Sequence, residues 1–150
     1  MPSLFEPAAK QAILERLSKL GQQASRQWGK MDAAQMMAHC SVAMEAATGD
    51  KPLKQRFVGR VFAPFVKKSL VKGDKSFPRN SPTDPTFVMA NAKDFAREKD
   101  YLTNLINRFC AAGPEHAGKH THSFFGRLTG DDWGVVMYKH LDHHLRQFGA

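Results

Sequence analysis

Cysteine is scarce in this sequence, and the two that occur, Cys40 and Cys110, lie far apart and form no CxxC pair. Two cysteines cannot build a disulfide framework, so the fold does not depend on cross-links. Isolated cysteines of this kind are typically small apolar core residues. We therefore expect two buried, reduced thiols.

Long apolar runs are also missing. No stretch approaches the roughly 18 consecutive apolar residues of a membrane-spanning helix. Residues 1–20 mix acids and bases, without the apolar centre of a signal peptide. The sequence predicts neither a membrane span nor a secretion signal, and we expect a cytoplasmic protein with no membrane partner.

Acidic residues are outnumbered, with 14 Asp and Glu against 22 Lys and Arg, for a formal net charge of +8. Between Lys51 and Arg79 one acid, Asp74, stands among nine bases, which we call the basic segment: Lys51, Lys54, Arg56, Arg60, Lys67, Lys68, Lys72, Lys75 and Arg79. Such a segment either attracts an anionic molecule or forms the solvated side of an amphipathic helix. No aromatic or glycine-rich nucleic-acid motif accompanies the charge, so we favour the solvated side and expect no nucleic-acid partner.

Internal repeats, low-complexity tracts and a convincing series of strands are absent as well. What the sequence has instead is helical periodicity, in five segments: 7–20, 33–48, 54–71, 92–112 and the residues after Thr129. Pro64 is expected to split the third segment into two short helices, and Gly113 with Pro114 to end the fourth. The 150 residues suffice for one core. The prediction is an all-α helical bundle with extra short helices, forming one domain over residues 1–150.

Two of these helices have clear end signals. Asp32 and Gln35 have the spacing of a capping box, and Gly49 closes that helix. Thr129 is the expected N-cap of the last helix, with acids in the first turn. Between the helices, residues 73–87 form a long loop with three prolines, Pro78, Pro82 and Pro85. Loops this long are often functional covers, so this one is a candidate cover for a site.

Three of the seven histidines stand in HLDHHLRQFG, residues 140–149, on the last helix. His140 and His144 are four residues apart, so a helix turns them by only about 40° and both project from one stripe. His143 is rotated by about 60° from His140, toward solvent or a position behind the ligands. The pair can face one metal ion, although such pairs also occur by chance on surface helices.

A third ligand must come from elsewhere, because catalytic zinc-type sites usually have three protein ligands and an open position. The candidates are the five remaining histidines: His39, His116, His120, His122 and His143. His39 is best placed, since it alone lies in a second well-capped helix. Taken alone, however, a histidine among Met and Ala residues is more typical of an ordinary core histidine.

The stretch HLDHHLRQFG resembles the histidine helix of the DinB/YfiT-like superfamily of metal-binding four-helix bundles, and WGKMDAAQMMAHC, residues 28–40, resembles its other ligand helix. Gln147 comes close to the family glutamine, whereas Leu145 displaces Arg146 from the family arginine position. HSFFGRLTGDDWGVVMYKH, residues 122–140, is similar to a subgroup of uncharacterised function. The resemblance implies an up-down-down-up bundle in which the metal ligands are His39, His140 and His144.

Three neutral imidazoles around Zn²⁺, Ni²⁺, Mn²⁺ or Fe²⁺ leave a coordination position for water, which makes hydrolysis accessible. The resemblance implies thiol transfer instead, because characterised relatives include transferases and isomerases that use bacillithiol, mycothiol or glutathione. We expect a metal-dependent S-transferase or hydrolase with a small-molecule substrate, for which the basic segment favours an anion. The alternative is a non-catalytic binding or scaffold protein, a homodimer whose metal is structural or absent. A fourth protein ligand, His122 or His143, would favour that alternative.

Overall fold

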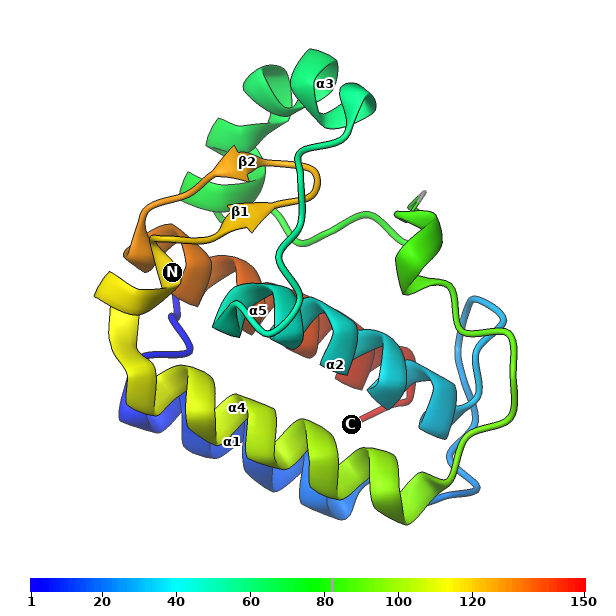
Figure 1. Cartoon of the computed structure of the whole chain (residues 1–150). Helices are drawn as coiled ribbons and strands as arrows, with labels where there is room; N and C mark the ends of the chain where they lie inside the picture. The colour runs from blue at the N-terminus through cyan, green and yellow to red at the C-terminus, as the bar shows by residue number, and fades with distance from the viewer. Residues whose placement is uncertain (82) are drawn as a thin grey trace.

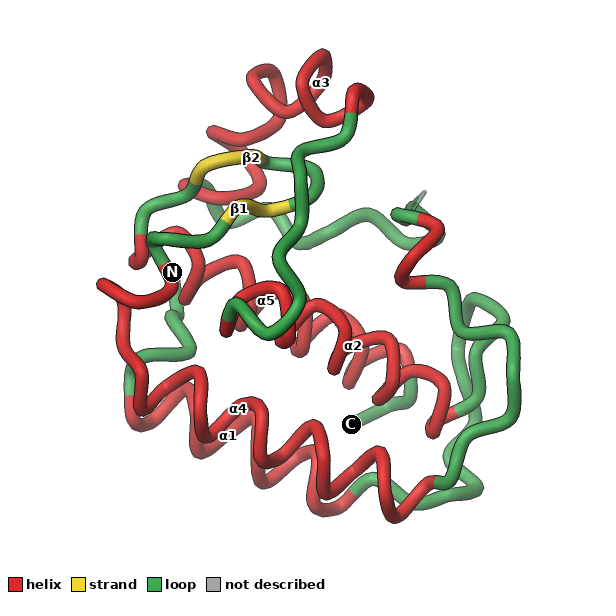
Figure 2. The backbone as a smooth tube through the Cα atoms, viewed as in Figure 1, coloured by secondary structure: helices red, strands yellow, loops and turns green. Residues whose placement is uncertain are grey.

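The computed structural model describes residues 1–81 and 83–150 and is mainly helical (Figure 2). Pro82, one of the three loop prolines, lies outside the described residues. The elements in chain order are α1 (Pro7–Lys19), α2 (Ala33–Thr48), α3 (Phe57–Lys67), a π-helical turn η1 (Lys68–Lys72), a 3₁₀ turn η2 (Pro85–Phe87), α4 (Phe95–Ala117), β1 (Thr121–His122), β2 (Gly126–Arg127) and α5 (Gly130–Gln147). The predicted all-α helical bundle is confirmed.

Four helices form the bundle, in the up-down-down-up order. The colour gradient in Figure 1 shows α1 and α5 running in one direction and α2 and α4 in the other. Side-chain contacts agree with these directions. The ammonium of Lys99, near the start of α4, donates to the carbonyls of Ser18 and Leu20 at the end of α1. Arg16 and Asp142, both in the second halves of their helices, form an ion pair of 2.7 Å between α1 and α5.

The predicted end signals of α2 and α5 are confirmed. Asp32 accepts from the backbone N–H of Gln35, and the Gln35 side chain accepts from the backbone N–H of Asp32, which completes a capping box. Gly49 follows with a φ of 85°, the left-handed conformation that closes many helices. Thr129 caps α5 in the same way, with Asp132 as its reciprocal partner. These caps set the ends of the two helices that carry the histidine cluster.

Two helices depart from the prediction. Helix α3 continues through Pro64, and the change of helix type comes at Lys68, because a proline removes one backbone hydrogen bond without always ending a helix. Helix α4 breaks at Gly113 (φ 79°, ψ 174°) as expected but resumes for one turn to Ala117. The strands of residues 1–81 and 83–150 are β1 and β2, of two residues each, which pair antiparallel.

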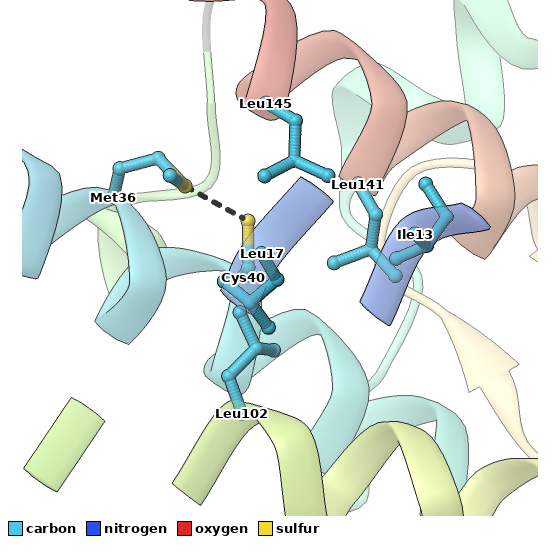
Figure 3. A pocket seen from close by; sticks show the side chains of 7 residues that line it. All are labelled: Ile13, Leu17, Met36, Cys40, Leu102, Leu141 and Leu145. Atoms are coloured by element: carbon cyan, nitrogen blue, oxygen red, sulfur yellow. Dashed lines mark hydrogen bonds between the residues drawn. The ribbon is translucent and has the colours of Figure 1, made fainter. Parts of the chain in front are cut away.

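The bundle core is packed tightly around Cys40. Figure 3 shows the side chains that surround it: Ile13, Leu17, Met36, Leu102, Leu141 and Leu145. The gap between them has no room for a water molecule. Cys40 is buried with its Sγ 3.7 Å from the sulfur of Met36, and both cysteines are free thiols. Cys40 matches the predicted core thiol, whereas Cys110 is only half-buried.

The segment after α3 is held against the bundle by one buried lysine. Lys139 in α5 donates from Nζ to the carbonyls of Leu70, Gly73 and Lys75, at 2.8, 2.6 and 2.9 Å. Burial lowers the pKa of Lys139. These bonds fix the start of the proline-rich loop beside the helix that carries two of the clustered histidines.

Within residues 1–81 and 83–150, no helix combines the length and the apolar character that a membrane crossing requires.

Candidate metal centre

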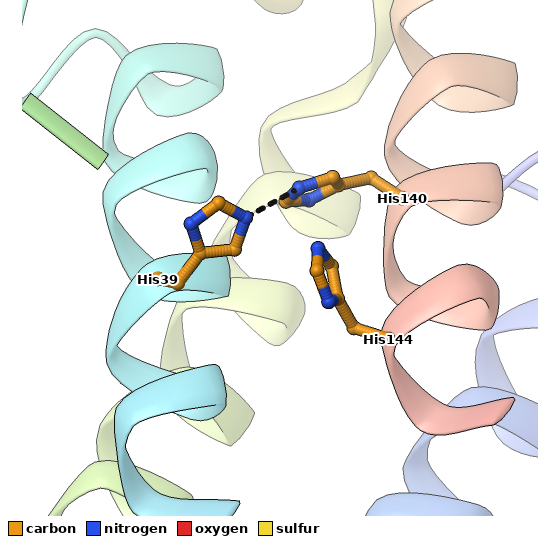
Figure 4. Close-up of side chains that lie close together, drawn as sticks. All are labelled: His39, His140 and His144. Atoms are coloured by element: carbon orange, nitrogen blue, oxygen red, sulfur yellow. Dashed lines mark hydrogen bonds between the residues drawn. The ribbon is translucent and has the colours of Figure 1, made fainter. Parts of the chain in front are cut away.

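Three histidines from two helices meet inside the bundle. His39 extends from α2, and His140 and His144 extend from consecutive turns of α5, so that the rings point toward one another (Figure 4). One ring nitrogen of each residue belongs to a set of atoms that all lie within 4.8 Å of one another. His39 and His144 are buried, and His140 is partly exposed. The sequence prediction named these three residues, and the structure brings them together.

A backbone carbonyl fixes the orientation of the His39 ring. Nδ1 of His39 lies 2.8 Å from the carbonyl oxygen of Phe87, which can only accept a hydrogen bond. The proton of the neutral ring is therefore on Nδ1, and Nε2 keeps its lone pair. Nε2 lies 3.1 Å from Nε2 of His140. The carbonyl comes from η2, at the end of the proline-rich loop, so the loop contacts the cluster as predicted.

A side-chain amide orients His144 in the same way. Nδ1 of His144 lies 2.8 Å from Oε1 of Gln147, one turn further along α5. The amide nitrogen of Gln147 donates to the carbonyl of Trp28 at 2.8 Å. This second bond fixes which end of the amide faces the histidine. His144 thus holds its proton on Nδ1 and presents an unprotonated Nε2, and hydrogen bonds of this type are typical of histidines that bind metals.

Burial keeps the cluster uncharged. It lowers the pKa of His144 to about 3 and that of His140 well below its usual range, with further lowering by the neighbouring imidazoles. Burial also lowers the pKa of His39, although the bond to Phe87 opposes it. All three rings are therefore neutral at physiological pH, the form that binds a metal ion.

The distances suit a metal ion. Two nitrogens on one tetrahedral zinc lie about 3.3 Å apart when each bond is about 2.05 Å, and the His39 and His140 Nε2 atoms are 3.1 Å apart. A neutral His140 that carries its proton on Nε2 can donate to Nε2 of His39 at this distance, and a cation bound between the two nitrogens would take the place of that proton. The three imidazoles are neutral, and the Nδ1 protons of His39 and His144 are bonded to Phe87 and Gln147, outside the cluster. Such a set of nitrogen donors fits a divalent first-row metal.

The other four histidines lie outside the cluster. His143 packs edge-on against Trp28, with ring centroids 5.4 Å apart. Nδ1 of His122 accepts from the backbone N–H groups of Phe124 and Phe125, and burial lowers the pKa of His122 to about 4. The remaining two, His116 and His120, contact each other, 3.2 Å apart at Nε2. Each of the four thus has another structural role.

A solvent-connected cavity of about 480 Å³ lies near the cluster, although none of the three clustered histidines lines it. His143 and Phe77 line the cavity, and their rings lie 5.0 Å from His144 and 6.5 Å from His140, respectively. Two guanidinium groups and an indole also line it, from Arg79, Arg146 and Trp28. The Arg79 guanidinium lies over the Trp28 ring at 4.1 Å. Asp142 also lines the cavity and forms an ion pair with Arg146, so Arg79 is the cavity's other guanidinium, beside the aromatic ring of Trp28.

Sequence reasoning missed the groups that orient the histidines. Gln147 matches a family pattern and lies one turn after His144 in the sequence, a spacing that permits contact but does not by itself predict the bond to the ring. The carbonyls of Phe87 and Trp28 are backbone atoms, whose positions depend on the loop conformation rather than on residue type. No pattern in the sequence could have identified them.

A family model described as "Protein of unknown function (DUF1569)" matches residues 4–150. No curated protein matches the chain, and no solved structure matches it.

Proposed function

The chain belongs to the DUF1569 family, whose function is unknown, and we propose that it is a metal-dependent enzyme whose ion is held by His39, His140 and His144. The observation that carries this proposal is the convergence of one nitrogen from each of the three rings within 4.8 Å. We also propose that the family belongs to the DinB/YfiT-like superfamily. The helix order and the placement of the ligand histidines on the second and last bundle helices support this assignment.

The residues of the chain hold the ion and set the ligand protonation. Phe87 and Gln147 keep protons on the Nδ1 atoms of His39 and His144, so both Nε2 atoms remain free to bind. A bound divalent ion supplies a Lewis acid that lowers the pKa of a water molecule or a thiol that joins it. Burial excludes bulk water from two of the three rings, which strengthens electrostatic interactions at the site.

The number of protein ligands favours catalysis over a structural role. Among the described residues, the group of potential ligands has three members, and His122 and His143, the proposed fourth ligands, have other partners. Structural zinc sites usually have four protein ligands, whereas catalytic sites leave a position open. The site therefore supports an enzyme better than a scaffold protein.

The adjacent cavity supports a small anionic substrate. Arg79, which lies over the Trp28 ring, can bind a carboxylate, whereas Arg146 is paired with Asp142. A low-molecular-weight thiol that carries carboxylates, such as glutathione, matches this lining. We propose thiol transfer as the reaction, with hydrolysis of an anionic small molecule as the second candidate.

Metal analysis tests the site directly. The wild-type protein, made metal-free and then titrated with Zn²⁺, Ni²⁺, Mn²⁺ or Fe²⁺, should bind one ion per chain with at least one of these metals. His39→Ala and His144→Ala should lose this binding, and His143→Ala serves as the matched control that keeps it. Gln147→Leu should weaken binding by roughly 10- to 100-fold, because it removes the acceptor that orients His144. Full occupancy in both His39→Ala and His144→Ala would refute the site.

Thiol binding separates the enzyme from the scaffold alternative. Glutathione should change the visible spectrum of the cobalt-loaded protein, whereas S-methylglutathione, which has the same carboxylates but no free thiol, should not. Arg79→Gln should weaken the glutathione response. If neither compound has an effect while metal binding is intact, the thiol proposal is wrong and a structural metal becomes the better account.

A further inference from the structure

Helix α3 exposes most of its large apolar side chains. The exposed fractions are 78% for Phe57, 58% for Val58, 41% for Val61, 56% for Phe62 and 81% for Phe65. On an α-helix these five residues lie within an arc of about 140°. We call them the α3 face. Figure 1 shows α3 at the edge of the molecule farthest from α1 and α4, so the face is not covered by the bundle.

Two small residues fix this orientation. Gly59 and Ala63 are the buried residues of α3, on the side opposite the α3 face. A Cβ atom at Gly59 would lie 2.2 Å from the carbonyl oxygen of Phe124, next to β2. The helix backbone therefore packs directly on this loop, and no larger residue fits there. Rotating α3 to bury its phenylalanines would require breaking this contact.

Bases without acidic partners lie in α3 or within three residues of its ends. Arg56 and Lys72 pair with Asp84 and Asp132. In contrast, no carboxylate among residues 1–81 and 83–150 lies within ion-pair distance of three exposed bases, Lys54, Arg60 and Lys68. An apolar strip with three phenylalanines beside unneutralised positive charge is typical of helices that lie in the interface of an anionic bilayer.

We propose that the α3 face binds the surface of an anionic lipid membrane, with its apolar side chains at the boundary of the acyl chains and the neighbouring bases on the headgroups. A projecting helix fits a flat surface, whereas a partner helix would need a groove. A second copy of the chain packed on this face would gather Arg60 and Lys68 of both copies in one interface, which is electrostatically unfavourable. The expectation of no membrane partner rests on the lack of a spanning segment and of a signal peptide in the sequence, and a surface contact needs neither.

Vesicle flotation tests this proposal. The probes are vesicles of phosphatidylcholine mixed with phosphatidylglycerol, with pure phosphatidylcholine as the comparison. The wild-type protein should float with the anionic vesicles only. Phe62→Ser combined with Phe65→Ser should weaken binding by roughly tenfold or more, because it removes apolar area without changing the net charge. Arg60→Gln and Lys68→Gln should each weaken it by about fivefold.

Val88→Ser is the matched control, because Val88 is an apolar residue 59% exposed outside the face, and it should bind like the wild type. The proposal is wrong if the protein does not float. It is also wrong if the double Phe variant floats as well as the wild type, because the attraction would then be due to net charge alone. Analytical ultracentrifugation tests the other possible occupant of the face, a second copy of the chain. A wild-type protein that is dimeric and a double Phe variant that is monomeric would assign the face to that second copy. None of these outcomes depends on a metal.

Discussion

The small residues of helices α2 and α3 lie in different surroundings. In α2 every residue except Gln35 and Val42 is buried, and alanines alternate with methionines and His39. In α3 the only buried residues are Gly59 and Ala63, and the large apolar residues face outward. Small residues in α2 let neighbouring helices approach on all sides, whereas in α3 they let one side of the backbone approach a loop. The same residue type thus marks an interior helix in one region and a docked, projecting helix in the other.

The comparison shows what an amphipathic pattern can predict. The periodicity of α3 predicts a helix with one apolar side, and the helix is present. It does not predict which side packs against the rest of the chain, because that depends on the close contact between Gly59 and Phe124. The expectation that the bases of this segment are solvated is met, but the apolar side of the helix is solvated too.

The largest expected effect comes from shortening a buried residue of α2. Met37 is fully buried, so Met37→Ala should lower the free energy of unfolding by about 2 to 5 kcal/mol. The matched change in α3, Phe65→Ala, should alter it by less than about 0.5 kcal/mol, because Phe65 is 81% exposed. Urea denaturation of both variants measures this contrast. Equal losses would mean that the α3 face is covered in solution.

The next effect tests how residues 70–75, which follow α3, are attached to the bundle. Lys139→Met keeps the apolar stem but removes the donor to three carbonyls, and should cost about 2 to 3 kcal/mol. Lys119→Met, at an exposed position, is the control and should change stability little. The same urea experiment applies. A neutral Lys139→Met would show that water replaces the ammonium without loss.

His122, in β1, should contribute to the pH dependence of stability. Its pKa is about 4 in the folded protein against 6.5 ordinarily, because the ring is buried. Between these values the unfolded chain binds a proton that the folded chain does not, so stability falls as the pH falls. The contribution is about 2 kcal/mol between pH 7 and pH 5.

Replacing this histidine by Asn isolates its effect. In His122→Asn the amide oxygen can still accept from the N–H groups of Phe124 and Phe125 but does not titrate. The loss of stability of the metal-free variant from pH 7 to pH 5 should be smaller than that of the metal-free wild type by about 2 kcal/mol. An unchanged pH profile would show that His122 takes up a proton as readily in the folded chain as in the unfolded one.

The smallest expected effect on stability depends on the close contact between Gly59 of α3 and Phe124. Gly→Ala inside an exposed helix normally stabilises by about 1 kcal/mol. Gly59→Ala should instead destabilise by about 1 kcal/mol, because the added Cβ overlaps the Phe124 carbonyl. Limited proteolysis should then cut within residues 57–72 sooner than in the wild type. A stabilising Gly59→Ala would mean that α3 does not pack as described.

Much of the fold could be predicted from the sequence because local signals specify it. The boundaries of α2 follow from Asp32, Gln35 and Gly49, whose effects reach only a few residues. The proximity of His140 and His144 follows from helical geometry alone. His39 joined them through a family resemblance, since no spacing rule relates residues a hundred positions apart. The roles of Gln147 and Lys139 depend on where distant carbonyls lie, and those positions exist only in the folded chain.

The three bonds of Lys139 have a consequence for how the molecule opens. A loop held only by its ends exchanges its amide hydrogens in local fluctuations, independently of the helices. Residues 70–75 are instead tied to the middle of α5, one residue from His140. Their carbonyls can be released only when the ammonium becomes exposed, which requires α5 to separate from this segment. Hydrogen exchange in this stretch should therefore occur together with that of α5, as one cooperative unit that includes the residues bordering the histidine cluster.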